Sequence, residues 1–458
     1  MEQINQKKRR PFQGMIAFSL LMSTAVFPIL LYLLYGLQLM GSVKGYWPFI
    51  LFYTTFTTGV FIWIPIVSKV GIYRSLQWSV AMTIISMIST VLFQQSSIWL
   101  EVSALITGFS VSATIPMTTT LLYRHVERGG DVFTPTHIAI VIGSLFLLLN
   151  LLLFSIQSVG LSVLFILYGA SLIVTLLIIR RMDPIEKVKE TPIVPIGAAV
   201  GRFLLISLLV IAVRVSRMIQ NEQMIFLFLI VSLVITVYMI MTVLKEKFIH
   251  SLSSSLPKRL QAESFLLGLG NGYLLLIGMF YSLSFYNILI SIYIVLVPYL
   301  AGLVLWTLVN DKLIKNMNPL NVFIISTFFI VFGFISPVLI SIGILLGSYV
   351  YNMVSTQNNM KVYKHDLPQR ELSILIHMTY RKIGNILLQF FVFVVIIFVG
   401  VYYNVDWYNL FQLIIGNNKV DIPGISGSLL MVILSFCCWS AMVGLVIWIN
   451  KLSKQKAV

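Results

Sequence analysis

Long, continuous apolar runs are the feature that most constrains how this chain folds. Of its 458 residues, 59% are hydrophobic and only 10% are charged, whereas a soluble globular chain carries about 25% charged residues. Because the hydrocarbon core of a bilayer is about 30 Å thick, a spanning helix needs roughly 20 apolar residues. The runs have this length and lack the alternation typical of a membrane β-barrel. We therefore predict an all-α polytopic membrane protein, which excludes a water-soluble enzyme and a disordered chain.

Charges, glycines, prolines and asparagines divide the apolar sequence into fourteen predicted spans. The longest run, 320–353, contains Ser336-Pro337 at its middle, and a single helix of this length would measure about 51 Å. Two helices joined by a tight turn fit a bilayer better, because proline disfavours helical geometry in the residue before it. The predicted spans are 14–36, 48–67, 76–94, 99–122, 137–156, 160–179, 196–214, 224–244, 264–284, 287–309, 320–335, 337–353, 383–403 and 427–449.

The distribution of positive charges supports this count, because basic residues concentrate in cytoplasmic loops. With fourteen spans, 26 of the 31 Lys and Arg residues fall on the side of the N-terminus and four on the opposite side, while Arg202 lies within a span. Thirteen spans would place the lysine-rich C-terminus on the other side. We predict a multi-pass protein of the bacterial inner membrane with both termini in the cytoplasm. The net charge of +16 is then a topology signal, and we expect no nucleic-acid partner.

The predicted spans group into two six-helix bundles, 1–182 and 261–458, with a two-helix insertion and its flanking loops at 183–260. The longest predicted loops are 354–382 and 404–426. Within the first, the segment Arg370–Tyr380 fits either a short interfacial helix or a plain loop. No phosphate-binding G-x-x-x-x-G-K-[ST] motif is present, so ATP-driven transport by this chain alone is not expected.

Several short motifs accompany this layout. The segment after span 48–67 contains Lys69, Gly71 and Arg74, and the segment after span 287–309 contains Asp311 and Lys312. A glycine-rich stretch, 268–272, opens span 264–284. In layout and in these motifs the chain resembles the fourteen-helix, QacA/EmrB-like drug–proton antiporters of the major facilitator superfamily. The resemblance implies two six-helix bundles and a gating role for those five loop residues.

The same resemblance shows where the chain departs from the family. The family's loop aspartate falls on Ser68 and the arginine of its fourth helix on Ala104. Span 137–156 contains Gly143 but no Gly-Pro pair. These departures concern residues that the family links to proton coupling and antiport.

Uncharged polar residues inside the spans are the candidates for a substrate cavity. Span 99–122 has hydroxyl residues spaced by three or four, which places them on one helix face. The alternative is that these hydroxyls bond carbonyls of their own helix or a neighbouring helix. The candidates are Ser103, Thr107, Ser110, Thr114 and Thr118, together with Asn150, Asn271 and Tyr273.

Charged residues near the membrane core are few. Glu101 and Glu263 are the acids closest to the membrane and hence the candidates for ion coupling, with solvated interfacial acids as the alternative. Arg202, Arg214 and Arg217 fit snorkelling to lipid headgroups, or attraction of an anionic substrate or headgroup.

Histidine and cysteine do not form a predicted metal or redox site. We expect all five histidines to be solvated, and no cofactor or metal is predicted. The histidines are His125, His137, His250, His365 and His377. Cys437 and Cys438 are adjacent in an apolar run and are expected to be buried thiols.

Together these features predict a secondary transporter, not an enzyme, that exports an amphipathic or apolar small molecule by alternating access. Its expected partners are the lipid bilayer and a small-molecule substrate. A membrane-fusion-type accessory protein is left open as a further partner. Two alternatives also remain open. One is a transporter-derived membrane partner or sensor that no longer transports, and the other is a transporter of lipid or cell-envelope precursors.

Overall fold

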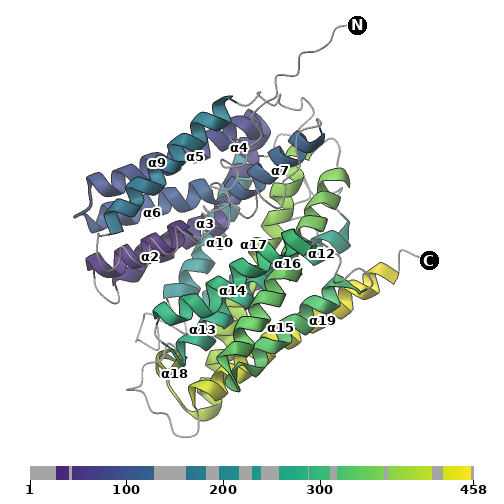
Figure 1. Cartoon of the computed structure of the whole chain (residues 1–458). Helices are drawn as coiled ribbons and strands as arrows, with labels where there is room; N and C mark the ends of the chain where they lie inside the picture. Colours follow the sequence, from purple (N-terminus) through teal and green to yellow (C-terminus); the bar gives the residue numbers. More distant parts are fainter. Residues whose placement is uncertain are drawn as a thin grey trace. The chain divides into compact units, whose positions relative to one another are not determined.

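The computed structural model of the chain is helical throughout the segments that it describes (Figure 1). These segments are residues 27–40, 44–127, 161–181, 195–215, 230–238, 257–286, 288–309, 317–365, 370–414 and 426–454. The chain forms two compact units. Unit 1 comprises Met1–Ser207 and Pro368–Leu375, and unit 2 comprises Leu208–Leu367 and Ile376–Val458.

Unit 1 is built around α6, which packs against α3 on one side and α5 on the other (Figure 1). Gly108 of α6 permits the first contact, because a side chain there would meet the backbone of Phe52 in α3. The described elements of the unit are α2 (Phe27–Met40), η1 (Lys44–Tyr46), α3 (Trp47–Thr58), α4 (Val60–Val70), α5 (Ile72–Leu92), α6 (Ser97–Val111), α7 (Thr114–Glu127), α9 (Leu161–Arg181) and the first part of α10 (Ile196–Val215).

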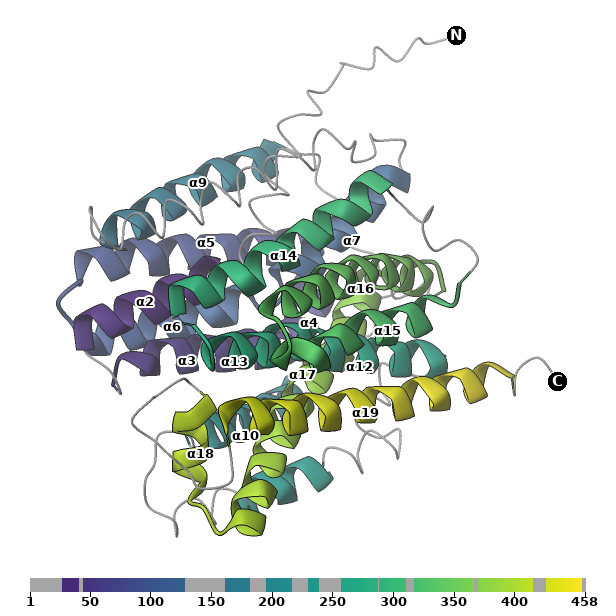
Figure 2. The same ribbon diagram turned by 60° about the horizontal axis from the view of Figure 1, so that its bottom comes forward.

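Unit 2 centres on α16, which lies beside α14 and α15 (Figure 2). Its α12 continues through a π-helical turn, η3, into α13, so the three form one apolar segment. The described elements are α12 (Lys258–Gly272), η3 (Tyr273–Ile277), α13 (Gly278–Leu283), α14 (Ile288–Val309), α15 (Pro319–Val331), η5 (Phe332–Phe334), α16 (Pro337–His365), α17 (Arg370–Tyr403), α18 (Trp407–Ile414) and α19 (Gly427–Lys454).

Eleven of the predicted spans coincide with helices of the structure, and of span 14–36 residues 27–36 are described and helical. Among the described residues, seven helices are long and apolar enough to cross a membrane, an eighth span is a pair bent by 48° between Thr58 and Val60, and four further apolar helices are shorter. Span 137–156 lies outside the described residues, and only 230–238 of span 224–244 are described. A multi-pass helical membrane protein is therefore what the structure supports, while the count of fourteen stays a prediction.

Glycine and proline end the helices where the sequence indicated. Gly71 separates α4 from α5 with a φ of 87°, a left-handed conformation that glycine adopts without strain. The predicted break in 320–353 is confirmed, because α15 gives way to η5 and α16 begins at Pro337.

Two helices are longer than predicted. The segment 354–382 was expected to be a loop, but α16 continues to His365 and α17 already begins at Arg370. The expectation of a separate interfacial helix or loop at Arg370–Tyr380 is therefore wrong, since this segment is the start of a 34-residue helix. At 1.5 Å per residue, α16 and α17 measure about 44 and 51 Å. Both exceed the roughly 30 Å of a hydrocarbon core, so each is long enough to extend beyond it.

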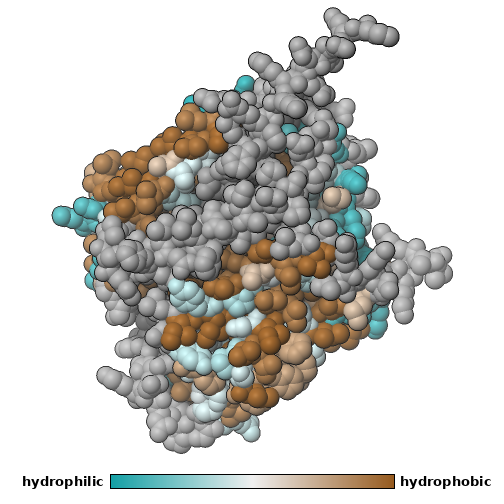
Figure 3. Space-filling view, in the orientation of Figure 1, coloured by the Kyte–Doolittle hydropathy of each residue, from teal (hydrophilic) through white to brown (hydrophobic). Residues whose placement is uncertain are grey.

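The described outer faces of both units are apolar. Hydrophobic side chains form broad areas on the described part of the surface (Figure 3). On α5, Leu92 is 73% exposed, and on α17, Phe398 is 70% exposed. Exposed side chains of this kind suit contact with lipid and identify the lipid-facing sides of these helices.

Candidate functional site

Hydroxyl side chains of α5 and α6 form a continuous interface between the two helices. Thr90 donates to Ser103 and Thr107 donates to Ser86, each at 2.8 Å. The interface continues along α5 in the same manner. Thr83 pairs with Ser110 of α6 and Ser79 pairs with Thr114, the first residue of α7, both at 2.8 Å.

This interface shows what the hydroxyl face of span 99–122 contacts in the structure, while its predicted role in a substrate cavity stays a prediction. All five candidates, Ser103, Thr107, Ser110, Thr114 and Thr118, are buried. Thr107 also bonds the hydroxyl of Tyr32 at 2.8 Å, and Thr118 donates to the carbonyl of Thr114 at 2.7 Å. The Thr118 bond lies within α7, whereas the bonds to α5 and to Tyr32 are interhelical and of the kind that stabilises helix pairs in membranes. Within this face, Ser103, Thr107 and Ser110 bond α6 to α5, and Thr114 bonds α7 to α5.

The other candidates in the first half of the chain are scattered. Lys69 in the last turn of α4 and Arg74 in the first turn of α5 are exposed on either side of Gly71. Glu101 is partly exposed in the second turn of α6. Asn150 lies outside the described residues.

Polar residues of unit 2 come together more closely. Tyr299 of α14 donates a 2.8 Å hydrogen bond to the side-chain oxygen of Asn271 in α12. Both residues lie near the middle of their apolar segments. Tyr273 is fully buried in the adjoining π-helical turn, a feature that is frequent at functional sites. The two predicted cavity residues of this helix thus share one region. Asp311 and Lys312 lie outside the described residues.

A polar face runs along α17. Its members recur at every fourth position, which aligns them on one side of the helix. We call this set the α17 polar face: His377, Arg381, Asn385 and Gln389. Bonds link neighbours along it, since Arg381 approaches His377 at 3.2 Å and Gln389 donates to Asn385 at 3.2 Å.

Arg381 ties α17 to α16. Its guanidinium donates to the hydroxyl of Ser355 at 2.5 Å, to the carbonyl of Ser355 at 3.2 Å and to the side-chain oxygen of Asn359 at 2.9 Å. The side chain is only 5% exposed. The sequence placed Arg381 in a cytoplasmic loop, and the structure corrects this because the helix begins eleven residues earlier, at Arg370.

His377 ties α17 to α12. Its ring nitrogens lie within hydrogen-bond distance of the Ser264 hydroxyl, Nε2 at 2.8 Å and Nδ1 closer still. His377 is 1% exposed, so the expectation that it is solvated is wrong. His125 is exposed as predicted, whereas His137 and His250 lie outside the described residues. His365 ends α16.

Arg214 joins α10 to the far end of the α17 polar face. Its guanidinium donates to the side-chain oxygen of Gln389 at 3.2 Å, and both side chains are buried. The structure therefore disagrees with snorkelling of Arg214 to lipid headgroups. In the part of α10 that belongs to unit 1, Ser207 bonds Thr58 of α3 at 2.9 Å.

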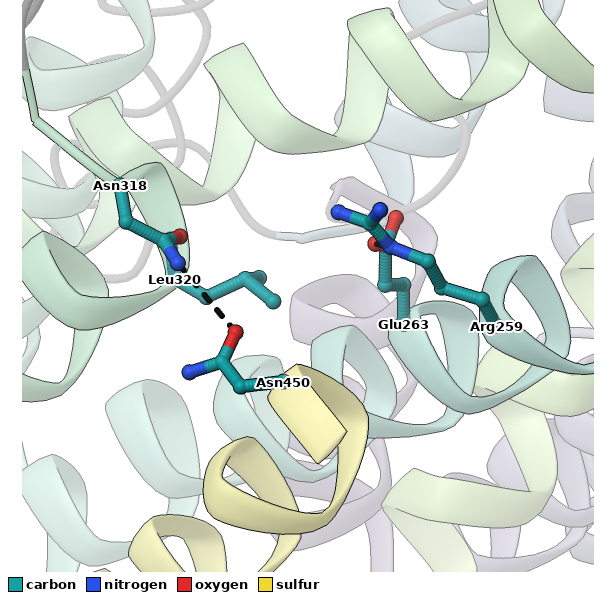
Figure 4. A network of polar contacts seen from close by, with 5 residues as sticks. All are labelled: Arg259, Glu263, Asn318, Leu320 and Asn450. Atoms are coloured by element: carbon teal, nitrogen blue, oxygen red, sulfur yellow. Dashed lines mark hydrogen bonds and ion pairs between the residues drawn. The ribbon is translucent and has the colours of Figure 1, made fainter. Parts of the chain in front are cut away.

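Glu263 lies beside this network. Among the side chains that the structure describes, it is the one acid that is buried. Its carboxylate forms a 2.8 Å ion pair with Arg259, one helical turn earlier (Figure 4). The neighbouring bond from Asn318 to Asn450, at 3.3 Å, joins the start of α15 to the end of α19 (Figure 4). The acid predicted as a coupling candidate is therefore paired with an arginine.

The α17 polar face is what the sequence prediction missed. A four-residue repeat of polar residues entering a predicted span, 377–381–385–389, was present as a signal. The predicted boundary between loop and span, after residue 382, separated this repeat into two parts. His377 and Arg381 were therefore interpreted as loop residues, apart from Asn385 and Gln389. No group of three or more metal-ligating side chains occurs in the part of the chain that the structure describes.

The fold itself is shared with known transporters. An auto-inhibited POT family peptide transporter superposes with a TM-score of 0.53 at 14% identity, covering 96% of this chain and 97% of that chain. The POT family transporter PepTSo gives 0.58 at 11% identity, with 97% and 99% coverage. The human organic anion transporter MFSD10 gives 0.51 at 15% identity, with 94% and 100% coverage.

These structures are transporters and not enzymes, and they establish a major facilitator-type fold over nearly the whole chain. No protein-family model and no curated protein matches the sequence. The resemblance is thus confirmed at the level of the fold, and membership of the fourteen-helix QacA/EmrB branch stays a prediction.

Proposed function

We propose that this protein is a secondary transporter that exports an amphipathic small molecule across a bacterial cell membrane by alternating access. The fold supports the class of protein, since its structural neighbours are secondary transporters. Alternating access is the general mechanism of such folds, and their internal helices are often discontinuous near the site. The π-helical turn between α12 and α13 fits that pattern.

The observation that carries the proposal is the α17 polar face. Burying polar and charged side chains within a membrane protein costs free energy, so such residues are retained mainly along substrate or ion pathways. Unit 2 combines such a face with lipid-exposed apolar sides on the same helix, where Phe398 and Val401 are about 70% exposed. A helix polar inward and apolar outward suits a protein that conducts a solute.

The chemistry of this region favours an amphipathic substrate over a purely apolar one. Asn271, Tyr299, Asn385 and Gln389 supply neutral donors and acceptors within an otherwise apolar unit. A few placed polar groups in an apolar lining fix the orientation of a bound small molecule. The substrate would then carry a polar group against α17 and an apolar body elsewhere.

A lipid or cell-envelope precursor is the second candidate substrate. Arg214 favours it, because a buried guanidinium pairs well with a phosphate or carboxylate head group. The apolar body required above is also a property of lipid-linked molecules.

The test is accumulation of a panel of amphipathic dyes and lipid-linked probes in cells that lack the gene or express it. Expression should lower the internal level of at least one compound, and Gln389→Leu should reverse that decrease at equal protein level in the membrane. Phe398→Leu is the matched control, since it alters an exposed position of the same helix.

Unchanged accumulation of every probe would instead support the alternative of a membrane partner or sensor. Equal behaviour of Gln389→Leu and Phe398→Leu would show that the α17 polar face does not contact the transported molecule.

A further inference from the structure

Two asparagines of unit 2, Asn271 of α12 and Asn385 of α17, occupy adjoining positions near the middle of their apolar segments. The side chain of Asn385 lies against the backbone next to Asn271, because a Cβ atom at Gly272 would be 2.8 Å from the Asn385 oxygen. Both asparagines are partly exposed, whereas the side chains that bond them are buried. The outward atoms of these two amides therefore determine what a molecule bound here would meet.

Arg214 fixes the orientation of the Asn385 amide through Gln389. A guanidinium donates hydrogen bonds and accepts none, so the Gln389 atom that Arg214 contacts at 3.2 Å is the oxygen. The nitrogen of Gln389 then faces Asn385 and donates to its side-chain oxygen at 3.2 Å. With this oxygen turned toward Gln389, the amide nitrogen of Asn385 points away from it. Because hydrogen bonds in a chain polarise one another, the bond from Gln389 also makes Asn385 a better donor.

Tyr299 orients the Asn271 amide in the same sense. Its phenol donates to the side-chain oxygen of Asn271 at 2.8 Å, and Tyr299 is only 8% exposed. The amide nitrogen of Asn271 therefore points away from the buried phenol. Asn352 of α16 shows the opposite arrangement, because its nitrogen donates to the carbonyl of Leu303 at 3.3 Å. The arrangement of Asn271 and Asn385 is thus not general to the asparagines of the unit.

Both amides use their oxygen within the protein and keep their N–H groups for another partner. Within the described part of the chain, the hydrogen bonds of these two side chains are the two that their oxygens accept. An amide nitrogen carries two N–H donors. Donors without an acceptor in the apolar interior of a membrane cost free energy, and a bound molecule that supplies an acceptor removes this cost.

We propose that Asn271 and Asn385 form a donor pair that binds an oxygen acceptor on the transported molecule, such as a carboxylate, phosphate or ester oxygen. The inference rests on the proposed export function and deepens it by naming the polar group of the substrate. A trimethylammonium group has no acceptor and would meet donors at this place. The apolar body of the substrate would occupy the apolar surroundings of the pair.

The acidic residues of the unit do not favour a cationic group at this pair. Among the described side chains, the one buried acid is Glu263 near the start of α12, and it is already ion-paired with Arg259 at 2.8 Å. The nearest groups that the pair itself offers are neutral donors. This chemistry favours acceptor-bearing molecules over cations of the same size.

The test is binding to the full-length protein in phosphatidylcholine nanodiscs, measured by fluorescence polarisation. The probes share a dansyl-labelled decyl chain and differ in the head group, which is a carboxylate, a methyl ester or a trimethylammonium. Empty nanodiscs correct for partition into lipid. The unmodified protein should bind the carboxylate and ester probes about tenfold more tightly than the trimethylammonium probe. Tighter binding of the carboxylate than of the ester would identify an anionic substrate, and equal binding a neutral one.

Aspartate variants invert the outward atom and keep the inward bond. In Asn271→Asp and Asn385→Asp a carboxylate oxygen still accepts from Tyr299 or Gln389, while an oxygen replaces the outward nitrogen. At about pH 8, where an aspartate is normally ionised, each variant should bind the carboxylate probe about tenfold more weakly and lose the preference over trimethylammonium. Asn404→Asp is the matched control, because it adds the same charge at an exposed position just beyond the end of α17. It should keep the preference of the unmodified protein.

Three results for the unmodified protein would overturn the proposal: a preference for trimethylammonium, equal binding of all three probes, or no binding of either acceptor probe. Aspartate variants that bind like the unmodified protein would overturn it as well. If these variants fail to fold, the neutral and smaller Asn271→Ala and Asn385→Ala replace them. They should also lose the preference for acceptor probes, and an unchanged preference would contradict the donor pair.

Failure of this inference is distinguishable from failure of the proposed function, because binding and export are measured separately. Export of a probe without any preference among the head groups refutes the donor pair and leaves the transporter standing. Binding with the expected preference but without export of any probe does the reverse.

Discussion

The backbone of Arg381 in α17 crosses directly over Gly268 in α12. A Cβ atom at Gly268 would lie 2.7 Å from the carbonyl carbon of Arg381 and 2.8 Å from its Cα. Neither atom is able to move aside as a flexible side chain would. The buried network around Arg381 and His377 therefore depends on the absence of a side chain at position 268.

Gly268→Ala is expected to destabilise the protein, because the added methyl group forces apart two packed backbones. Overpacking of this kind costs about 1–3 kcal/mol. Thermal unfolding of the purified protein in nanodiscs measures the effect. Gly444→Ala is the control, since a Cβ at Gly444 meets nothing within 4 Å. Equal melting temperatures for the two variants would contradict the close crossing.

Removal of single hydroxyls from the α5–α6 interface should destabilise the helix pair modestly. Thr107→Val deletes the donor to Ser86 and the contact with Tyr32 while keeping the volume of the side chain. Interhelical hydrogen bonds in membranes contribute about 0.6 kcal/mol each. A double-mutant cycle with Ser86→Ala should therefore give a coupling energy near that value. Thr119→Val is the control, because Thr119 bonds the carbonyl of Ile115 in its own helix. A coupling energy of zero between Thr107 and Ser86 would contradict a stabilising hydrogen bond between these two residues.

Tyr299→Phe is expected to reduce export several-fold without lowering the amount of protein in the membrane. It removes only the hydroxyl that donates to Asn271 at 2.8 Å. Efflux of a probe identified in the accumulation assay reports the change. Tyr293→Phe is the matched control, because Tyr293 belongs to the same helix and is 42% exposed. Identical loss of efflux in both variants would show that the Asn271 contact has no special part in transport.

The positive charges predict the topology of the chain. A reporter fused after Val458 should be active in the cytoplasm, and an epitope inserted near Asn417 should be accessible from outside intact cells. Both expectations follow from the concentration of Lys and Arg on the side of the N-terminus. An external C-terminal reporter would mean that the number of spans is odd.

Much of the helical layout was predictable because hydrophobicity alone determines which segments enter a bilayer. The break at Ser336-Pro337 followed from proline geometry, and the turn at Gly71 from a short loop motif. Hydropathy did not predict how far α16 and α17 continue, because segment 354–382 is polar, although many of its described side chains are buried within the protein. Sequence reasoning therefore described Arg381 and His377 as loop residues.

The candidate site was harder to predict for the same reason. A row of hydroxyls looks alike in sequence whether it faces a cavity or a neighbouring helix. The structure adds the partner row on α5, which consists of Ser79, Thr83, Ser86 and Thr90. Conversely, Asn271 and Tyr273 were singled out from a glycine-rich helix, and the structure places them together at a π-helical turn.

The division of the chain into units has a consequence for its biosynthesis. Unit 1 contains residues 370–375, which the ribosome makes after the whole of Leu208–Leu367 in unit 2. Four of these six residues, Leu372 to Leu375, are almost completely buried. At about 5–20 residues per second, some ten to thirty seconds of translation separate the first part of unit 1 from its last. The N-terminal half therefore waits in the membrane as an incomplete intermediate until the start of α17 emerges.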